Sequence, residues 1–268
     1  MDMPPYSSQW EVLVPRLRND IFRFLSSKAM CRSIQIRLIH SSWRLLKKKS
    51  PAEKRWLVRQ SNDPYVKASH ALNFRCRSAF KLLEVDDKFR LLQPGYCVVD
   101  CGAAPGAWSQ VAVHRVNSAG TDSKLPSGTV VGIDLLNMHP LDGAHFLSSH
   151  DVADPATHAK LCDLLPGGQA HLLLSDMAPN ASGFRELDHE RLITLCLSLL
   201  DLAEKILRPG GSLLCKYWDG SLARKLQERL LLVFSNVQSL KPNASRKDSA
   251  ERYFLARNYR KADDNRLF

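Results

Sequence analysis

The sequence predicts an α/β fold built on a mostly parallel sheet, and three observations carry this prediction. From Gly95 onward, short apolar runs alternate with segments of helical periodicity. The runs at 171–175 and 212–215 are continuously apolar, as expected of strands covered on both faces. Glycines and small residues follow the first run, at 101–106, ahead of a helical segment. Such alternation requires right-handed crossovers, which place helices on both faces of the sheet.

The individual elements follow from the same patterns. In the segment 188–207, leucines and an isoleucine recur at helical spacing, and the sequence RPGG at 208–211 predicts a helix stop followed by a turn. Further helices are predicted over 75–90, 107–117, 155–165 and 221–233. The predicted strands, which form a seven-stranded sheet, are 97–100, 129–134, 145–149, 171–175, 212–217, 236–241 and 252–258.

The composition is that of a globular protein. The chain has 268 residues, of which 44% are hydrophobic and 24% are charged. No run approaches the roughly 18 uninterrupted apolar residues of a transmembrane helix, so we expect no membrane span. The 7 cysteines are scattered and none forms a C-x-x-C pair, which favours reduced core thiols over disulfides or zinc. We therefore expect one main domain that contains no metal.

The net charge of +11 is concentrated near the N-terminus. Residues 1–69 contain 14 lysines and arginines against 5 acidic residues, which leaves only +2 for residues 70–268. The charge of the whole chain is therefore a weak argument for RNA binding. That argument must rest on local clusters of basic residues.

A basic leader precedes the predicted domain. Residues 21–52 contain 8 basic residues and no acidic ones, with serines and bulky apolar residues between them, which is typical of a mitochondrial transit segment. Acidic residues further upstream are unusual for such a segment, so Met30 is an alternative start. A disordered arm that contacts RNA phosphates is the second interpretation. We assign residues 1–60 to this leader and residues 61–268 to a single domain.

Polar residues stand where the predicted strands end. They are four acids and one lysine: Asp100, Asp134, Asp151, Asp176 and Lys216. The ends of parallel strands share one edge of the sheet, and ligands bind at that edge. A single acid at such a position often caps the following helix instead. Five polar residues together favour a binding site.

The loop at 101–106 narrows the class of ligand. Its glycines, Gly102 and Gly106, are spaced G-x-x-x-G, which differs from the G-x-G-x-x-G of dinucleotide enzymes. A nicotinamide dehydrogenase is therefore disfavoured. Small residues at a helix N-terminus let a ligand approach the backbone closely, and Asp134 suits hydrogen bonding to ribose hydroxyls. The pattern indicates an adenosine-like ligand.

Several motifs together resemble those of the FtsJ/RrmJ-type ribosomal RNA 2′-O-ribose methyltransferases. They are DCGAAPGAWSQ, IDLL, SDMAPN, LLCKYW and SRKDSAERYFLA, and the resemblance runs from about Asp63 to about Tyr259. With its basic leader, the chain is most similar to the mitochondrial branch of this family, which modifies a uridine of large-subunit rRNA. The resemblance implies a Rossmann-like class I methyltransferase fold and the use of S-adenosylmethionine.

The resemblance also implies a catalytic set. The family's Lys–Asp–Lys–Glu residues fall on Lys81, Asp176, Lys216 and Glu251, and all four residue types are intact. Lys216 would take the proton from the attacking ribose 2′-hydroxyl, for which the lysine must first be neutral. Asp176 would orient this lysine, while Lys81 would favour its neutral form and hold the RNA. Glu251 would position the lysines or the ribose.

Cofactor contacts are implied in the same way. The residues concerned are Pro105, Gly106, Ala107 and Trp108 in the first loop, Asp134 for the ribose hydroxyls, Asp151 for the adenine amino group and Asp176 for the methyl-donor end. Ala107 departs from the pattern, because the family often has a second glycine there. A helical backbone at that position would tolerate the extra methyl group.

Two clusters of basic residues are expected to flank the catalytic groove and to contact RNA phosphates. They comprise Arg75 and Arg77 in one cluster, and Lys241, Arg246, Lys247 and Arg252 in the other. Ordinary solvated charge is the alternative for each residue. No aromatic platform for base stacking is evident, which favours recognition of RNA shape or of a large-subunit precursor. A monomer in the mitochondrial matrix is expected.

Two other functions stay open at this point. The same catalytic set would serve a 2′-O-methyltransferase that acts on tRNA, an mRNA cap or another RNA. A ribosome-assembly factor with the methyltransferase fold and little catalysis is the second alternative, although the intact catalytic set argues against it.

Overall fold

The computed structural model describes residues 50–260, and the chain divides into two compact units after Leu72. In the first unit, helix α2 (Pro51–Asn62) precedes α3 (Pro64–Ala71). Asp63 begins α3 as its N-cap and accepts a hydrogen bond from the Tyr65 amide at 3.0 Å. The boundary predicted at residue 60 falls inside α2, and the division into leader and domain stays a prediction. The leader up to residue 49, with Met30, lies outside the described residues.

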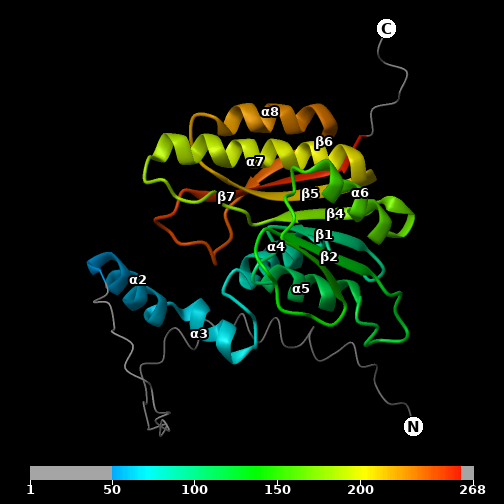
Figure 1. Ribbon diagram of the computed structural model, residues 1–268, viewed down its shortest axis with the longest axis horizontal. Coiled ribbons are helices and arrows are strands. Elements are labelled where there is room, and N and C mark those ends of the chain that lie inside the picture. Colours follow the sequence, from blue (N-terminus) through cyan, green and yellow to red (C-terminus); the bar gives the residue numbers. More distant parts are fainter. Residues whose placement is uncertain (1–49, 261–268) are drawn as a thin grey trace, which may run out of the picture. The chain divides into compact units, whose positions relative to one another are not determined.

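The second unit is built on a seven-stranded sheet in the order β3-β2-β1-β4-β5-β7-β6 (Figure 1). Strand β7 runs antiparallel to both of its neighbours, and the other pairs are parallel. The predicted mostly parallel α/β sheet is therefore confirmed. The strands are β1 (Cys97–Cys101), β2 (Thr129–Asp134), β3 (Ala144–Ser148), β4 (Ala170–Ser175), β5 (Leu207–Trp218), β6 (Phe234–Leu240) and β7 (Glu251–Tyr259).

Helices cover both faces of this sheet, as predicted, and each face has its own layer of core side chains. One layer joins the strands to α4 and α5, through residues such as Leu82 and Val111. The other joins them to α6, α7 and α8, through residues such as Leu161, Leu199 and Leu226. Each fully buried leucine contributes about 2 kcal/mol by leaving water. The helices are α4 (Ala79–Phe89), α5 (Ala107–Val116), α6 (Pro155–Leu164), α7 (Arg185–Ile206) and α8 (Ala223–Val233), with a short 3-10 turn η1 (Pro166–Gly168).

The register of the sheet brings the functional strand ends together. Cys101 at the end of β1 pairs with Ser175 at the end of β4, and Ser175 pairs in turn with Cys215 of β5. Gly102, Asp176 and Lys216 each follow one of these paired residues directly in the chain. The first loop, Asp176 and Lys216 therefore emerge at one edge of the sheet.

Strand β5 differs from its prediction at its start. Helix α7 ends at Ile206, as the RPGG sequence predicts, but β5 begins at once at Leu207. Leu207 pairs with Ala170 and Ser212 pairs with Leu172, so residues 208–211 face His171 alone. These four residues opposite one form an enlarged bulge, in which Gly210 adopts a left-handed φ of 78°. The turn expected here is thus part of the strand.

Within residues 50–260, the cysteines are all free, and no group of three or more His, Cys, Asp or Glu residues could hold a metal ion. None of the described helices has the length and apolar character needed to cross a membrane.

Candidate active site

Asp176, which directly follows β4, is the centre of a buried polar cluster. Its Oδ1 lies 3.1 Å from Nζ of Lys216, and its Oδ2 lies 3.6 Å from Nζ of Lys81. Lys216 also donates a short hydrogen bond to the backbone carbonyl of Asp176. Both lysines are only 8% exposed, so the carboxylate offsets the cost of burying two ammonium groups.

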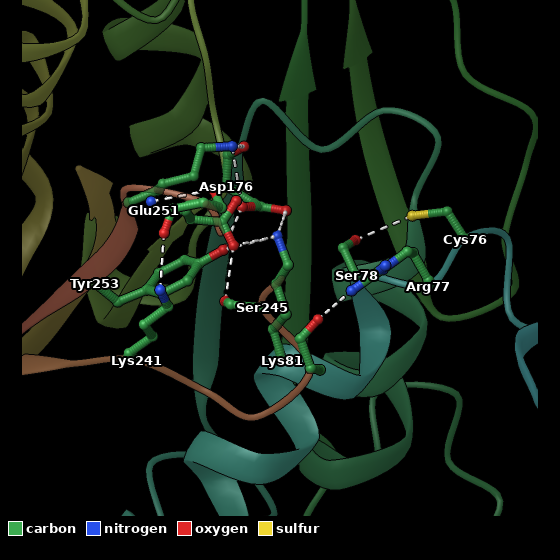
Figure 2. Close-up of polar contacts among 12 residues, drawn as sticks. Cys76, Arg77, Ser78, Lys81, Asp176, Lys241, Ser245, Glu251 and Tyr253 are labelled. Carbon is green, nitrogen blue, oxygen red and sulfur yellow. Dashed lines mark hydrogen bonds and ion pairs between the residues drawn. The ribbon is translucent and has the colours of Figure 1, made fainter. Parts of the chain in front are cut away.

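Lys81 links this carboxylate to a second one. Its Nζ lies 2.8 Å from Oε1 of Glu251, which begins β7, and Figure 2 shows the lysine extending from helix α4 into the cluster. The hydroxyl of Ser245 donates to the same Glu251 oxygen at 2.8 Å. The four residues predicted as the catalytic set thus come together from α4, β4, β5 and β7. Their meeting supports the assignment, and their catalytic roles stay a prediction.

Tyr253 is a member of the cluster that sequence reasoning missed. Its hydroxyl donates to Oδ1 of Asp176 at 2.5 Å and accepts from Nζ of Lys81 at 3.1 Å (Figure 2). Tyr253 pairs with Lys216 across β5 and β7, and it lies two residues after Glu251, which puts all three side chains on one face. That spacing of two from Glu251 is the signal that could have identified it.

Opposing electrostatic effects fix the protonation of this centre. Burial raises the pKa of Asp176, but the charges of Lys216 and Lys81 and the hydrogen bond from Tyr253 outweigh burial and leave the pKa below its ordinary value. Burial, together with the negative charges of Asp176 and Glu251, raises the pKa of Tyr253 well above its ordinary value. At neutral pH, Asp176 is therefore a carboxylate and Tyr253 a hydrogen-bond donor.

The first loop, residues 102–106, closes one side of a small pocket. A cavity of about 40 Å³ lies between this loop, Trp108 and Asp176. Gly102 has a φ of 72°, and a Cβ there would lie 2.1 Å from Cγ of Met177, so the loop requires glycine. Gly106, with a φ of 105°, precedes α5 as its N-cap. The loop, which contains only glycine, alanine and proline, thus brings its backbone close to the buried polar cluster.

Asp100 lines the same pocket from the end of β1 and is fully buried. Burial, assisted by the negative charges of Asp176 and Asp134, raises its pKa to about 7. The hydroxyl of Ser109 in α5 donates to its carboxyl group at 2.7 Å, which ties the strand to the helix behind the loop. This acid was seen in the sequence as a strand-end residue, without a role.

The other predicted cofactor residues lie at different distances from this pocket. Asp134 accepts hydrogen bonds from the Ala104 and Leu136 amides, each at 2.8 Å, so its carboxylate lies against the first loop. Trp108 is buried in α5 and donates its indole N–H to the Ser78 carbonyl at 2.8 Å. Asp151 is exposed after β3 and accepts from the Ala153 amide at 2.9 Å. Pro105 and Ala107 line the pocket, and Ala107 is the first helical residue of α5.

The donor set around this pocket fits S-adenosylmethionine. A loop of glycine, alanine and proline at a helix N-terminus, an acid beside the loop and an anionic Asp176 at its end suit an adenosine that carries a positive charge. A comparison with known families shows to which family the chain belongs. Residues 74–259 match the model of a family described as FtsJ-like methyltransferase. The chain belongs to this family.

Relatives of this FtsJ-like methyltransferase bear consistent names. It is 44% identical to the mitochondrial rRNA methyltransferase 2 of Drosophila melanogaster, over 83% of this chain and 89% of that protein. It is 46% identical to the ribosomal RNA large subunit methyltransferase E of Bradyrhizobium diazoefficiens, over 80% of this chain and 90% of that one. A crystal structure of a ribosomal RNA methyltransferase from Plasmodium falciparum superposes with a TM-score of 0.61 at 26% identity, covering 69% of this chain and 98% of that one.

Arg75 of this methyltransferase, predicted to contact RNA, makes contacts within the protein. Its guanidinium donates to the backbone carbonyls of Pro105, His139 and Pro140, at 2.5–3.0 Å. It also packs on Gly106, where a Cβ would lie 2.5 Å from its Nη1. Arg75 therefore joins the first loop to the segment after β2, and a role in RNA binding stays a prediction.

The second predicted basic cluster surrounds the loop 241–250, which connects β6 to β7. Lys241 donates to the carbonyls of Lys247 and Ser249, at 3.1 and 2.7 Å, and closes this loop on itself. Arg77 of the first cluster donates to the Ala244 carbonyl. The remaining members differ in exposure: Lys247 is exposed, Arg246 is half-buried, and Arg252 donates to Ser239 at 2.9 Å and lies 3.9 Å from Asp219.

Sequence reasoning also missed Glu84, which fixes the position of this loop. Its carboxylate accepts from the amides of Asn243 and Ala244, at 2.6 and 2.9 Å, and so ties the loop to helix α4. Ser245 of the same loop contacts Glu251. The loop, its basic residues and the catalytic cluster therefore form one connected unit.

Proposed function

We propose that this protein transfers a methyl group from S-adenosylmethionine to the ribose 2′-oxygen of a uridine in mitochondrial large-subunit rRNA. The observation that carries the proposal is the buried carboxylate of Asp176 between Lys216 and Lys81, beside a glycine loop. Family membership and the names of the relatives, which are methyltransferases of mitochondrial or large-subunit ribosomal RNA, support this substrate class.

Some of the residues proposed to hold the cofactor line the pocket, and the proposed site extends from there to Asp134 and Asp151. S-adenosylmethionine supplies an electrophilic methyl group on a positively charged sulfur. Asp176 would face this charge, Asp134 the ribose hydroxyls and Asp151 the adenine amino group. The loop residues Pro105, Gly106 and Ala107, with Trp108, would line the remainder of the site.

Lys216 is the proposed general base. A ribose hydroxyl becomes an effective nucleophile when its proton leaves as the new C–O bond forms. Lys216 is held at Asp176 by two of its hydrogen bonds, which fix the direction of its lone pair once it is neutral. Asp176 is the counter-ion of both lysines, so any further positive charge beside it weakens its hold on the Lys216 proton. Lys81, itself paired with Glu251, would supply such a positive charge and so favour the neutral form of Lys216.

The basic loop 241–250 is proposed to hold the RNA beside this cluster. Lys247 is exposed on the loop, and Arg246 lies next to it. Phosphate contacts of this kind would position the RNA and add little sequence discrimination. The leader outside the described residues, with the composition of a transit segment, is the basis for proposing the mitochondrial matrix as the location.

The decisive experiment replaces Lys216 with methionine, which keeps an unbranched side chain one atom shorter and removes the amine. We expect methyl transfer to mitochondrial large-subunit rRNA to fall by about 10²–10⁴-fold, the range of general-base catalysis. Affinity for S-adenosylmethionine, measured by calorimetric titration, should change by less than about threefold because the first loop is untouched.

Lys225→Met, at an exposed position in α8, is the matched control and should leave methyl transfer unchanged. In cells, ribose methylation of mitochondrial rRNA is mapped with the gene deleted and then restored as wild type or as Lys216→Met. Full methylation of every large-subunit site without the gene would refute this substrate. Loss of methylation on tRNA alone would point to the tRNA alternative.

A further inference from the structure

A second cavity lies at the other end of the parallel strands from the cluster of Lys81, Asp176, Lys216 and Glu251. It has a volume of about 270 Å³, close to the roughly 300 Å³ at which ligand pockets begin. Its walls come from the start of β4, the bulge 208–211 of β5, the last half of β7 and the end of α4. The parallel strands β4 and β5 contribute their N-terminal ends to this cavity, whereas Asp176 and Lys216 stand at the C-terminal ends of the same strands.

The charged residues that line this cavity are basic. Arg90, Arg208 and Arg257 contribute three guanidinium groups, and His171 adds an imidazole. None of the described residues in its lining is acidic. Three permanent positive charges without a counter-ion in the lining favour an anionic ligand.

Two of these groups have donors that face no acceptor. Nδ1 of His171 accepts a hydrogen bond from the Cys97 amide at 3.0 Å, so a neutral ring carries its proton on Nε2. That Nε2 lies 2.8 Å from Nη1 of Arg208, which is also a donor. Burial and the charge of Arg208 lower the pKa of His171, so the ring is neutral at physiological pH. Two N–H groups thus converge on a place where an acceptor is needed.

Arg257 presents a further unsatisfied donor. Its Nε is buried and has no hydrogen-bond partner among the described residues. Its guanidinium stacks over the ring of Phe89, with Cζ 5.8 Å from the centroid, which fixes the direction of its N–H groups. A buried N–H without an acceptor destabilises the fold, and an anion in the cavity would offer an acceptor to this guanidinium.

We propose that this cavity, lined by Arg90, His171, Arg208 and Arg257, binds a phosphate group of the RNA backbone. A phosphate oxygen between His171 and Arg208 would accept from both, and a tetrahedral group offers further oxygens to the other two arginines. The choice of RNA as the source of the phosphate rests on the proposed function. The cavity would give the enzyme a second hold on its RNA, on the far side of the sheet from the reacting ribose.

Removal of an exposed arginine provides the test. Arg208 is exposed on the bulge, so Arg208→Gln should leave the fold and the affinity for S-adenosylmethionine intact. We expect the affinity for transcribed mitochondrial large-subunit rRNA to fall about 3- to 10-fold at moderate salt, and the slope of log affinity against log salt to decrease by about one. The Arg208→Lys variant keeps the charge but loses the planar guanidinium. Its RNA affinity should lie between those of the wild type and Arg208→Gln.

Arg224→Gln is the matched control, because Arg224 is an equally basic exposed residue paired with Glu228 on α8. It should leave the RNA affinity within about twofold and the salt slope unchanged. An equal loss in both arginine variants would reduce the effect to general charge and overturn the site.

A second measurement follows the ring nitrogens of His171 by NMR, with inorganic phosphate and with the rRNA transcript added separately. Shifts with both ligands support the proposal. Shifts with inorganic phosphate alone, with an unchanged RNA affinity in Arg208→Gln, assign the cavity to small phosphates and overturn the RNA assignment. No shift with either ligand refutes the site. A wild-type protein that shifts with RNA but methylates none would refute the proposed function and leave this site standing.

Discussion

Tyr253 has the most contacts with the other catalytic candidates of any residue that sequence reasoning missed. Its hydroxyl contacts Asp176 and Lys81, so it fixes the carboxylate to which Lys216 is bound. Because it acts through Asp176 and Lys81, we regard it as a positioning residue.

Tyr253→Phe should therefore lower the rate of methyl transfer by about tenfold without loss of the fold, because one charge-assisted hydrogen bond is removed. That bond lowers the pKa of Asp176, so its loss raises this pKa and moves the acidic limb of the pH–rate profile to higher pH. Single-turnover rates between about pH 3 and pH 9 measure both effects. Tyr259→Phe, away from the cluster, is the control, and an unshifted acidic limb in Tyr253→Phe would contradict this role.

Asp100 makes stability depend on pH in the opposite direction from most carboxylates. Its pKa of about 7 in the folded protein lies above the ordinary value of 3.8. Protonation of Asp100 thus stabilises the fold, fully below about pH 4, and this contribution is lost as the pH rises to about 7. Asp100→Asn imitates the protonated acid and should raise the free energy of unfolding at pH 8 by on the order of 2–4 kcal/mol.

The difference between Asp100→Asn and wild type should shrink as the pH falls toward 4. Thermal unfolding at pH 5 and pH 8 measures this difference, and we expect a gain of several degrees at pH 8 and a smaller gain at pH 5. An equal change in Tm at both pH values would mean that the substitution acts through packing and that titration of Asp100 has no part in it.

At the scale of elements, the conformation of the first loop depends on the close approach of the residues that follow β1 and β4. Gly102 leaves β1 with a left-handed φ of 72° and faces the side chain of Met177, which follows β4. A substituent here has to move Met177, and with it the neighbouring Asp176.

Gly102→Ala should therefore cost more than its backbone strain of about 1–3 kcal/mol, and it should weaken S-adenosylmethionine binding by about tenfold or more. Gly120→Ala is a matched control, because Gly120 has a φ of 65° but no atom within 4 Å of an added Cβ. Calorimetric titration and thermal unfolding of both variants separate the effect of a clash with Met177 from that of backbone strain. Equal losses in the two would remove the argument from close packing.

At the scale of the whole molecule, the second unit contains its own core. Both layers of buried side chains consist of residues from Ala79 onward. We expect residues 73–268, expressed alone, to unfold in one cooperative transition with a Tm within about 5 °C of the full chain. Differential scanning calorimetry of both proteins tests this, and a broad transition without a heat-absorption peak would show that the core needs the first unit.

Much of this architecture could be predicted because buried strands appear in the sequence as unbroken runs of apolar residues. β2 has the predicted bounds, and the other strands begin within two residues of their predictions apart from β5. β5 begins five residues early because a bulge continues the strand through a proline–glycine sequence. Helix α2 escaped prediction because its sequence, PAEKRWLVRQSN, is dominated by charged and polar residues.

The candidate site was only partly predictable, since a motif names residue types and not their partners. Lys81, Asp176, Lys216 and Glu251 meet as the resemblance implies. Arg75 carries the same charge in the sequence as Lys247, yet it is bonded to three backbone carbonyls while Lys247 is exposed. Such differences depend on tertiary contacts between segments 30 or more residues apart.

The catalytic cluster holds two ammonium groups and two carboxylates within a few ångströms of each other. Their fields cancel outside the cluster, and little solvent reaches it, so mobile ions gain almost nothing by entering. Added salt would release the RNA from its phosphate contacts but leave the chemical step of bound substrate at its original speed. Changes in ionic strength would therefore alter the affinity for RNA without altering the rate of methyl transfer to bound RNA.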